Sequence, residues 1–245
     1  MAADAALIED VAREARDRLE LWTWFLNCVR ARRVAEIGVF RGTFAARILA
    51  ACPAIETYYM IDPWRHLEDW NKPANRPDDV FEQIFAEALE KTEAHAARRA
   101  VLRGRTTEVV GDIPDASLDF AYVDGDHTLR GITTDLIRIY PKVGREGWIG
   151  GDDFSPSIWQ HGGEFEPTFV FPFALYFAEA VGARLYGLPR GQFLLEKASN
   201  AFEFVDLTGR YERRTVLDQL RGPPRRSIAY RLAQAAKLGR RGRAS

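Results

Sequence analysis

Short apolar segments with the character of β-strands alternate with longer segments of helical character along most of this chain. The expected strands are residues 34–38, 57–62, 100–102, 118–123, 148–150, 183–186 and 192–196. The expected helices are residues 6–33, 43–51, 80–97, 106–110, 129–140 and 170–181. An alternation of this kind predicts an α/β layered fold with a largely parallel sheet.

The length and the hydrophobic content predict one main domain with an extension at each end. A chain of 245 residues that is 47% hydrophobic can bury a substantial core. We expect a helical extension at residues 1–33, the main domain at 34–198 and a C-terminal extension at 199–245. From Arg221 onward the sequence is rich in arginine and contains no acid, which favours a solvated basic tail.

Composition excludes several classes of protein. The formal net charge of -1 argues against a surface built to bind nucleic acid. Cys28 and Cys52 have no metal-binding spacing, so neither a disulfide framework nor a zinc ribbon is supported. Acids precede the first apolar run, unlike in a secretory signal, and no apolar stretch is long enough to span a bilayer. We therefore expect a cytoplasmic protein.

Acidic side chains follow two consecutive expected strands. Asp124, Asp126 and His127 come directly after residues 118–123, and Asp152 and Asp153 follow residues 148–150. Because the carboxyl ends of neighbouring parallel strands lie side by side, these acids should converge at the edge where ligands bind. Crowded carboxylates repel one another unless a hard divalent cation binds between them. Either cluster alone could be a simple turn, but both together with a histidine favour a metal-assisted active site.

A glycine-containing loop follows the first expected strand and opens a helix. Its sequence is Glu-Ile-Gly-Val-Phe-Arg-Gly-Thr at residues 36–43. A dinucleotide site would need a glycine where Phe40 stands, because the pyrophosphate approaches the backbone there. The loop therefore suits a ligand without phosphates. Asp62, at the end of the second expected strand, is placed to accept hydrogen bonds from ribose hydroxyls.

The Glu-x-Gly-x-x-x-Gly pattern resembles motif I of the class I S-adenosylmethionine-dependent methyltransferases. The resemblance extends over residues 34–197 and implies a Rossmann-like sheet, mostly parallel with the last strand antiparallel, and helices on both faces. It also implies a methyltransferase domain at residues 34–198 with S-adenosylmethionine as cofactor. The implied cofactor-binding residues are Glu36 near the methionine ammonium, Gly38, Gly42 and Thr43 in the loop, Asp62 on the ribose, Gly104, Arg105 and Thr106 near the adenine, and Asp124. The alternative is an ordinary glycine-rich α/β turn.

The two acid clusters narrow the resemblance to the divalent-metal-dependent O-methyltransferases, which include catechol, caffeoyl-coenzyme A and macrolide-sugar or aminocoumarin-sugar enzymes. By that resemblance, Asp124, Asp152 and Asp153 would bind Mg²⁺ or Mn²⁺. The Asp-x-x-His spacing is especially similar to the mycinamicin-type sugar methyltransferases, where the histidine is the proposed base. His127 then takes that role, and Asp126 is the rival base.

The polar loop at residues 63–79 carries aromatic residues that could contact an acceptor. Aromatic faces beside hydrogen-bonding groups suit a carbohydrate, so Trp64, His66 and Trp70 are candidate acceptor contacts. His161, in the loop after the second acid cluster, is a further candidate. The tryptophans could equally pin the loop to the core. The expected function is O-methylation of a sugar, glycosylated metabolite or polysaccharide, with self-association as a homodimer left open. The alternatives are a catechol or phenol methyltransferase, a nicotinamide-dependent oxidoreductase and a non-catalytic binding protein.

Overall fold

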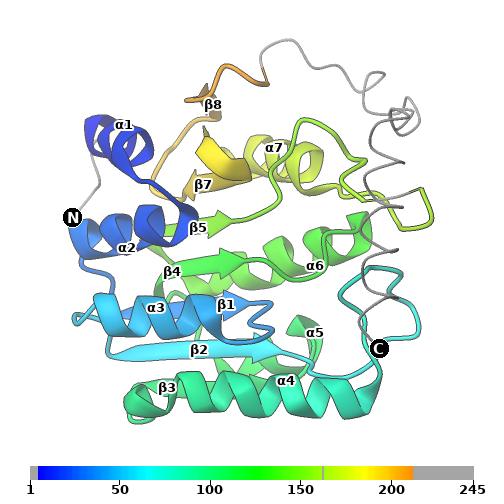
Figure 1. Ribbon diagram of the computed structural model, residues 1–245. Helices are drawn as coiled ribbons and strands as arrows, with labels where there is room; N and C mark the ends of the chain where they lie inside the picture. The colour runs from blue at the N-terminus through cyan, green and yellow to red at the C-terminus, as the bar shows by residue number, and fades with distance from the viewer. Residues whose placement is uncertain (1–4, 162, 212–245) are drawn as a thin grey trace.

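The computed structural model describes residues 5–161 and 163–211, which form a single eight-stranded sheet flanked by helices (Figure 1). The strand order is β3-β2-β1-β4-β5-β7-β6-β8. The strands are β1 (Arg33–Ile37), β2 (Thr57–Asp62), β3 (Arg99–Arg103), β4 (Leu118–Val123), β5 (Val143–Gly151), β6 (Arg184–Leu188), β7 (Gln192–Glu196) and β8 (Glu203–Asp206). Strand β7 is antiparallel to β5 and β6, and the other pairings are parallel. The predicted fold class, a Rossmann-like sheet that is mostly parallel, is confirmed.

The helices cover both faces of the sheet, as predicted. They are α1 (Ala5–Glu14), α2 (Arg18–Val29), α3 (Thr43–Ala51), α4 (Asp78–Lys91), α5 (Thr106–Val109), α6 (Leu129–Ile139) and α7 (Val170–Val181). Alternate side chains of β4 point to opposite faces: Phe120 and Tyr122 pack with α1 to α4, whereas Ala121 and Val123 pack with α6 and α7. The sheet therefore separates two hydrophobic cores.

The structure corrects one predicted helix and adds one strand that was not predicted. The single helix expected at residues 6–33 is two helices, because the Asp17 side chain accepts a hydrogen bond from the Glu20 N–H and caps a new helix, α2. Strand β7, the last strand predicted from the sequence, is antiparallel as expected, and β8, which was not predicted, pairs in parallel with β6. Strand β8 also lies beyond residue 198, where we expected the main domain to end. The proposed division into domains stays a prediction.

The parallel pairing of β4 with β5 sets the position of the acids. Val123 lies opposite Gly151 in the register, so Asp124 and Asp152 follow on neighbouring strands at the same edge. None of the helices within residues 5–161 and 163–211 is long and apolar enough to cross a membrane. The predicted basic tail from residue 221 lies outside the described residues.

Candidate active site

A cavity of about 650 Å³ opens at the carboxyl ends of the central strands. Most of the residues predicted from sequence to form the site line it: Glu36, Gly38, Thr43, Asp62, Gly104, Arg105, Thr106, Asp124, Asp126, His127, Asp153, Trp70 and His161. Among the described residues, the lining leaves out Gly42, Trp64, His66 and Asp152, which were also predicted to belong to the site. The topology thus brings together residues that lie far apart in the sequence.

The loop after β1 forms one wall of the cavity. Gly38 has φ +88°, and a Cβ atom there would overlap the backbone carbonyl of Asp124. Glycine is therefore required for β1 and β4 to approach each other at this point. Gly42 has φ +70° and would meet Ala88 of α4 if it carried a side chain. Gly42 thus permits helix packing, which explains why it contributes no surface to the cavity.

Asp62 is fixed in orientation at the end of β2. Its two carboxylate oxygens accept hydrogen bonds from the backbone N–H groups of Phe40 and Trp64, each at 2.8 Å. Burial raises the pKa of Asp62 to about 6, although the two backbone hydrogen bonds oppose the rise. The carboxylate is thus held rigidly at the cavity wall.

Glu36 is a buried acid on β1, only 2% exposed. The Tyr58 hydroxyl donates a hydrogen bond of 2.6 Å to its carboxylate. Burial raises the pKa of Glu36 to about 8, against the opposing effect of that hydrogen bond. A cationic ligand group beside Glu36 would favour the ionised carboxylate.

A second buried acid, Asp135, was not identified from the sequence. It lies on α6 and accepts a hydrogen bond of 2.6 Å from the Thr106 hydroxyl, and both residues line the cavity. Burial raises the pKa of Asp135 to about 7, and the hydrogen bond from Thr106 only partly opposes that rise. The available signal was its position on the apolar face of α6, between Ile132 and Leu136.

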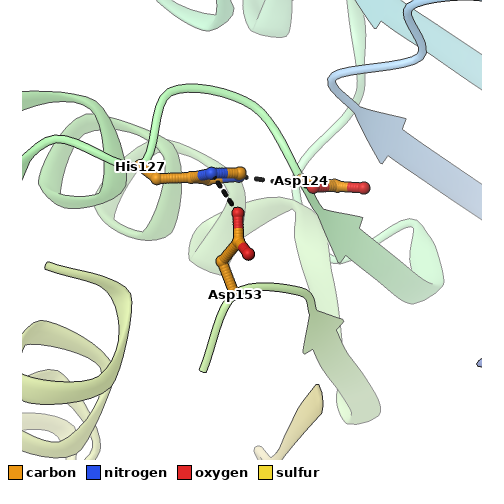
Figure 2. A group of neighbouring side chains, drawn as sticks. All are labelled: Asp124, His127 and Asp153. Atoms are coloured by element: carbon orange, nitrogen blue, oxygen red, sulfur yellow. Dashed lines mark ion pairs between the residues drawn. The ribbon is translucent and has the colours of Figure 1, made fainter. Parts of the chain in front are cut away.

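Figure 2 shows the group formed by Asp124, His127 and Asp153. The Nε2 atom of His127 lies 3.3 Å from an Asp124 carboxylate oxygen, and Nδ1 contacts the Asp153 carboxylate. Burial lowers the pKa of His127, but the bonds to both carboxylates outweigh burial and raise it to about 10. In this arrangement both ring nitrogens of His127 are protonated at neutral pH, and the imidazole is positively charged. It could act as the expected neutral base only after these carboxylates take another cationic partner.

The donor set of this group fits a divalent cation. One ligand atom from each of the three residues lies within 4.8 Å of the others. Carboxylate oxygens suit Mg²⁺ and Mn²⁺, and an imidazole nitrogen is compatible with Mn²⁺. The structure brings His127 into this group, whereas the sequence pattern predicted Asp152 as the third ligand.

Asp152 is held outside the group by two side chains that the sequence analysis did not single out. Gln192 donates a hydrogen bond of 2.5 Å to one Asp152 oxygen, and an Arg18 Nη1 group contacts the other. The same Nη1 group lies 3.2 Å from an Asp124 oxygen. Nothing in the sequence distinguishes Arg18 from other helical arginines, because its importance comes from the packing of α2 against the sheet.

The acceptor contacts predicted from sequence divide into two groups. Trp64 is fully buried, and its indole N–H donates to the Phe40 carbonyl at 2.8 Å, which favours the alternative that it pins the loop to the core. His66 turns toward its own loop, with a ring nitrogen 3.2 Å from the Arg76 carbonyl. Trp70 and His161 do line the cavity. The indole N–H of Trp70 is buried and has no hydrogen-bond partner among the described residues.

Lys72 joins the two loops on this side of the cavity. Its ammonium donates hydrogen bonds to the carbonyls of Glu166 at 2.7 Å and Pro167 at 3.2 Å, and to the Thr168 hydroxyl at 3.2 Å. Asn71 adds a hydrogen bond of 2.8 Å to the Glu164 carbonyl. The loop after β2 is thereby tied to the segment that precedes α7.

Comparison with known proteins agrees with this architecture. Residues 35–154 match a family described as a methyltransferase domain. This part of the chain therefore resembles a methyltransferase domain. The matched segment runs from β1 to the residue after Asp153, so it includes the glycine-containing loop and both acid clusters.

Solved methyltransferase structures share the fold at low sequence identity. A putative caffeoyl-CoA O-methyltransferase from Staphylococcus aureus is 13% identical with a TM-score of 0.54, covering 77% of this chain and 91% of that chain. A methyltransferase from Podospora anserina, with bound S-adenosylhomocysteine, is 14% identical with a TM-score of 0.52, covering 80% and 89%.

A curated relative is much longer than this chain. An uncharacterized protein of Sinorhizobium fredii is 23% identical over 203 residues, which is 76% of this chain but 22% of the relative. The chain therefore spans less than a quarter of that protein's length.

Proposed function

We propose that the chain transfers the methyl group of S-adenosylmethionine to a hydroxyl oxygen, with Mg²⁺ or Mn²⁺ bound beside the cofactor. The observation that carries the proposal is the convergence of Asp124, His127 and Asp153 on the wall of the cavity that the glycine loop and Asp62 also line. The similar fold of the putative caffeoyl-CoA O-methyltransferase supports the choice of an oxygen acceptor.

The proposed cofactor contacts follow from the position and charge of the lining residues. Glu36 would accept a hydrogen bond from the methionine ammonium, and Asp62 would accept from the ribose hydroxyls. Arg105 and Thr106 would lie near the adenine; both line the cavity, at the start of α5. Because most of these groups are fixed by backbone or buried side-chain bonds, the methyl group can be held in line with the acceptor oxygen, and such positioning supplies much of the rate acceleration.

The proton of the acceptor needs a base in the cavity. A bound cation would lower the pKa of the hydroxyl and fix its orientation. We propose Asp124 and Asp153 as ligands, with Asp152 or His127 as the third. If Asp152 is the third ligand, His127 takes the proton; if His127 is a ligand, Asp126 takes it. The methyl group leaves the sulfonium sulfur for the oxygen, and S-adenosylhomocysteine remains.

We propose a sugar or glycosylated metabolite as the first acceptor class to test. Trp70 supports it, because its partly exposed aromatic ring lines the cavity and can stack on the apolar face of a sugar ring. His161 lies on the same cavity wall and offers a second polar group. A phenol would instead require a flatter site, and it serves as the contrasting class in the experiment.

The test is product analysis with methyl-labelled S-adenosylmethionine and matched panels of sugars and phenols. We expect label in an ether product, loss of transfer in excess EDTA, and recovery when Mg²⁺ or Mn²⁺ is restored. Full transfer in excess chelator would contradict the metal requirement. Label on nitrogen or carbon acceptors alone would contradict the proposed O-methylation.

Two variants separate the roles of His127 and Asp126. If His127 is the base, His127→Ala lowers the rate by about 10²–10⁴ while Mn²⁺ affinity stays near the wild-type value. If His127 is a ligand, the same change weakens Mn²⁺ binding, and Asp126→Asn causes the loss of rate instead. Measuring Mn²⁺ binding and single-turnover rates on both variants decides between these assignments.

A further inference from the structure

Arg18 occupies the space between two of the three predicted metal ligands. Its Nη1 group contacts the carboxylates of Asp124 and Asp152, one at the end of β4 and one at the end of β5. Without a cation these two acids would repel each other across the gap between neighbouring strands. The positive charge of the Arg18 guanidinium offsets that repulsion.

The position of Arg18 on α2 is unfavourable for helix stability. It is the first residue of α2, and a positive charge at a helix N-terminus opposes the helix dipole. A cation at this position must therefore be stabilised by other contacts, which here are the carboxylates of the site. Its side chain is 42% exposed, so it can move into solvent without leaving a charge buried.

A buried network holds the partner of Arg18 in place. Gln192 is fully buried, and its carbonyl oxygen accepts hydrogen bonds from Trp22 at 2.7 Å and Tyr122 at 2.8 Å. Its amide nitrogen is thereby directed at Asp152, 2.5 Å away. The backbone N–H of Asp153 donates to the same Asp152 oxygen at 2.8 Å. With one oxygen of Asp152 fixed in this way, the other is directed at Arg18.

From these contacts we infer that Arg18 is a displaceable internal cation that competes with a divalent metal for Asp124 and Asp152. The inference rests on the proposed metal site. In the metal-free protein Arg18 neutralises the carboxylates; when a cation binds, Arg18 leaves and its contacts are lost. Cation affinity is therefore set partly by a residue of α2 that is not itself a ligand, and metal binding is coupled to the position of that helix end.

The experiment measures Mn²⁺ binding by electron paramagnetic resonance on the full chain. Arg18→Met removes the competitor, so Mn²⁺ should bind more tightly, by between about 5-fold and 150-fold, the range of typical coupling between two sites. Arg16→Met is the matched control: it removes the same charge two residues away, from a side chain that is 87% exposed and pairs with Glu20. That variant should bind Mn²⁺ within about twofold of the wild type, because exposed charges contribute little.

Thermal unfolding supplies an independent readout. Without metal, Arg18→Met should unfold at a lower temperature than the wild type, and saturating Mn²⁺ should close most of that difference. Arg18→Lys keeps the positive charge on a compact, more strongly hydrated ammonium, so it should show an intermediate Mn²⁺ affinity, and it serves if Arg18→Met does not fold.

The outcomes separate this inference from the proposed function. Equal Mn²⁺ affinity in the wild type and both Arg18 variants would overturn the role of Arg18 and leave the metal site standing. Weaker Mn²⁺ binding in Arg18→Met would show that Arg18 supports the site rather than competing with it. No Mn²⁺ binding by any of the proteins would overturn the inference and the metal site together.

Discussion

The carboxylates of Glu36 and Asp62 are fixed by hydrogen bonds that the sequence does not reveal. Motif positions predicted that Glu36 and Asp62 would face a ligand, and both line the cavity. Their partners, Tyr58 and two backbone N–H groups, depend on how β1 and β2 pair. Residue types and spacing could therefore predict which acids belong to the site. They could not predict the burial that sets the pKa of each acid.

Asp62→Ala should weaken binding of S-adenosylhomocysteine, because the proposed charge-assisted bond to the ribose is lost. Such a bond contributes roughly 1.5–3 kcal/mol, or about 10-fold to 150-fold in affinity. Isothermal titration calorimetry measures the change. Asp119→Ala is the control, because the Asp119 carboxylate also accepts two backbone hydrogen bonds, at 2.7 and 2.8 Å. Asp119 lies near the amino end of β4, away from the cavity at the carboxyl ends of the strands. Unchanged affinity in Asp62→Ala would show that the ribose partner lies elsewhere.

Asp135 should make the stability of the protein depend on pH. Its pKa rises from 3.8 to about 7 on folding, so the folded state holds the proton more tightly than the unfolded state. Stability should therefore fall as pH rises from about 4 to 7, with a slope of up to about 1.4 kcal/mol per pH unit from this group. Asp135→Asn, which cannot ionise, should remove that part of the slope. We expect urea unfolding at several pH values to show a wild-type curve steeper than the variant curve, and parallel curves would contradict the assignment.

At the level of elements, periodicity predicted most strands and helices, but it predicted only residues 148–150 of β5 and missed both β8 and the break between α1 and α2. Strands β2, β4 and β7 and helix α7 match their predicted bounds, because each has an apolar pattern between clear breaks. Strand β8 has only four residues and is partly exposed, so it has little pattern of its own. The break between α1 and α2 depends on one capping contact from Asp17. The sequence does not reveal this break, because the apolar stripe continues past Asp17.

The loops over the cavity should respond together to the loss of Lys72. Lys72 is 6% exposed, and its ammonium joins the loop after β2 to residues 166–168. Lys72→Met keeps the aliphatic part of the side chain but removes all three hydrogen bonds. We expect faster amide hydrogen exchange in residues 65–77 and 163–169 with unchanged exchange in the sheet, measured by mass spectrometry. Lys91→Met, an exposed lysine on α4 paired with Glu87, is the control. Faster exchange in one loop alone would contradict a direct link.

For the whole molecule, the topology predicts the site better than any single motif does. Parallel pairing of β1, β2 and β4 was enough to predict that acids after separate strands share one edge. The sequence could not predict that His127, and not Asp152, lies in the group with Asp124 and Asp153. That outcome depends on the contacts of Asp152 with Arg18 of α2 and Gln192 of β7. The site is therefore completed by elements at both ends of the described chain.

Because the cavity is lined by residues from α2 to the segment that follows β5, a ligand there should stabilise the domain as one unit. A ligand that binds only the folded state at 100 times its dissociation constant adds about 2.7 kcal/mol to the free energy of unfolding. We expect S-adenosylhomocysteine to raise the unfolding temperature in a single transition, measured by scanning calorimetry. NADH is the control ligand, since Phe40 blocks the place where a pyrophosphate would lie against the glycine loop. Stabilisation by NADH without stabilisation by S-adenosylhomocysteine would contradict the assigned cofactor. Asp62→Ala should need a higher S-adenosylhomocysteine concentration for the same rise, which links the stabilisation to this cavity.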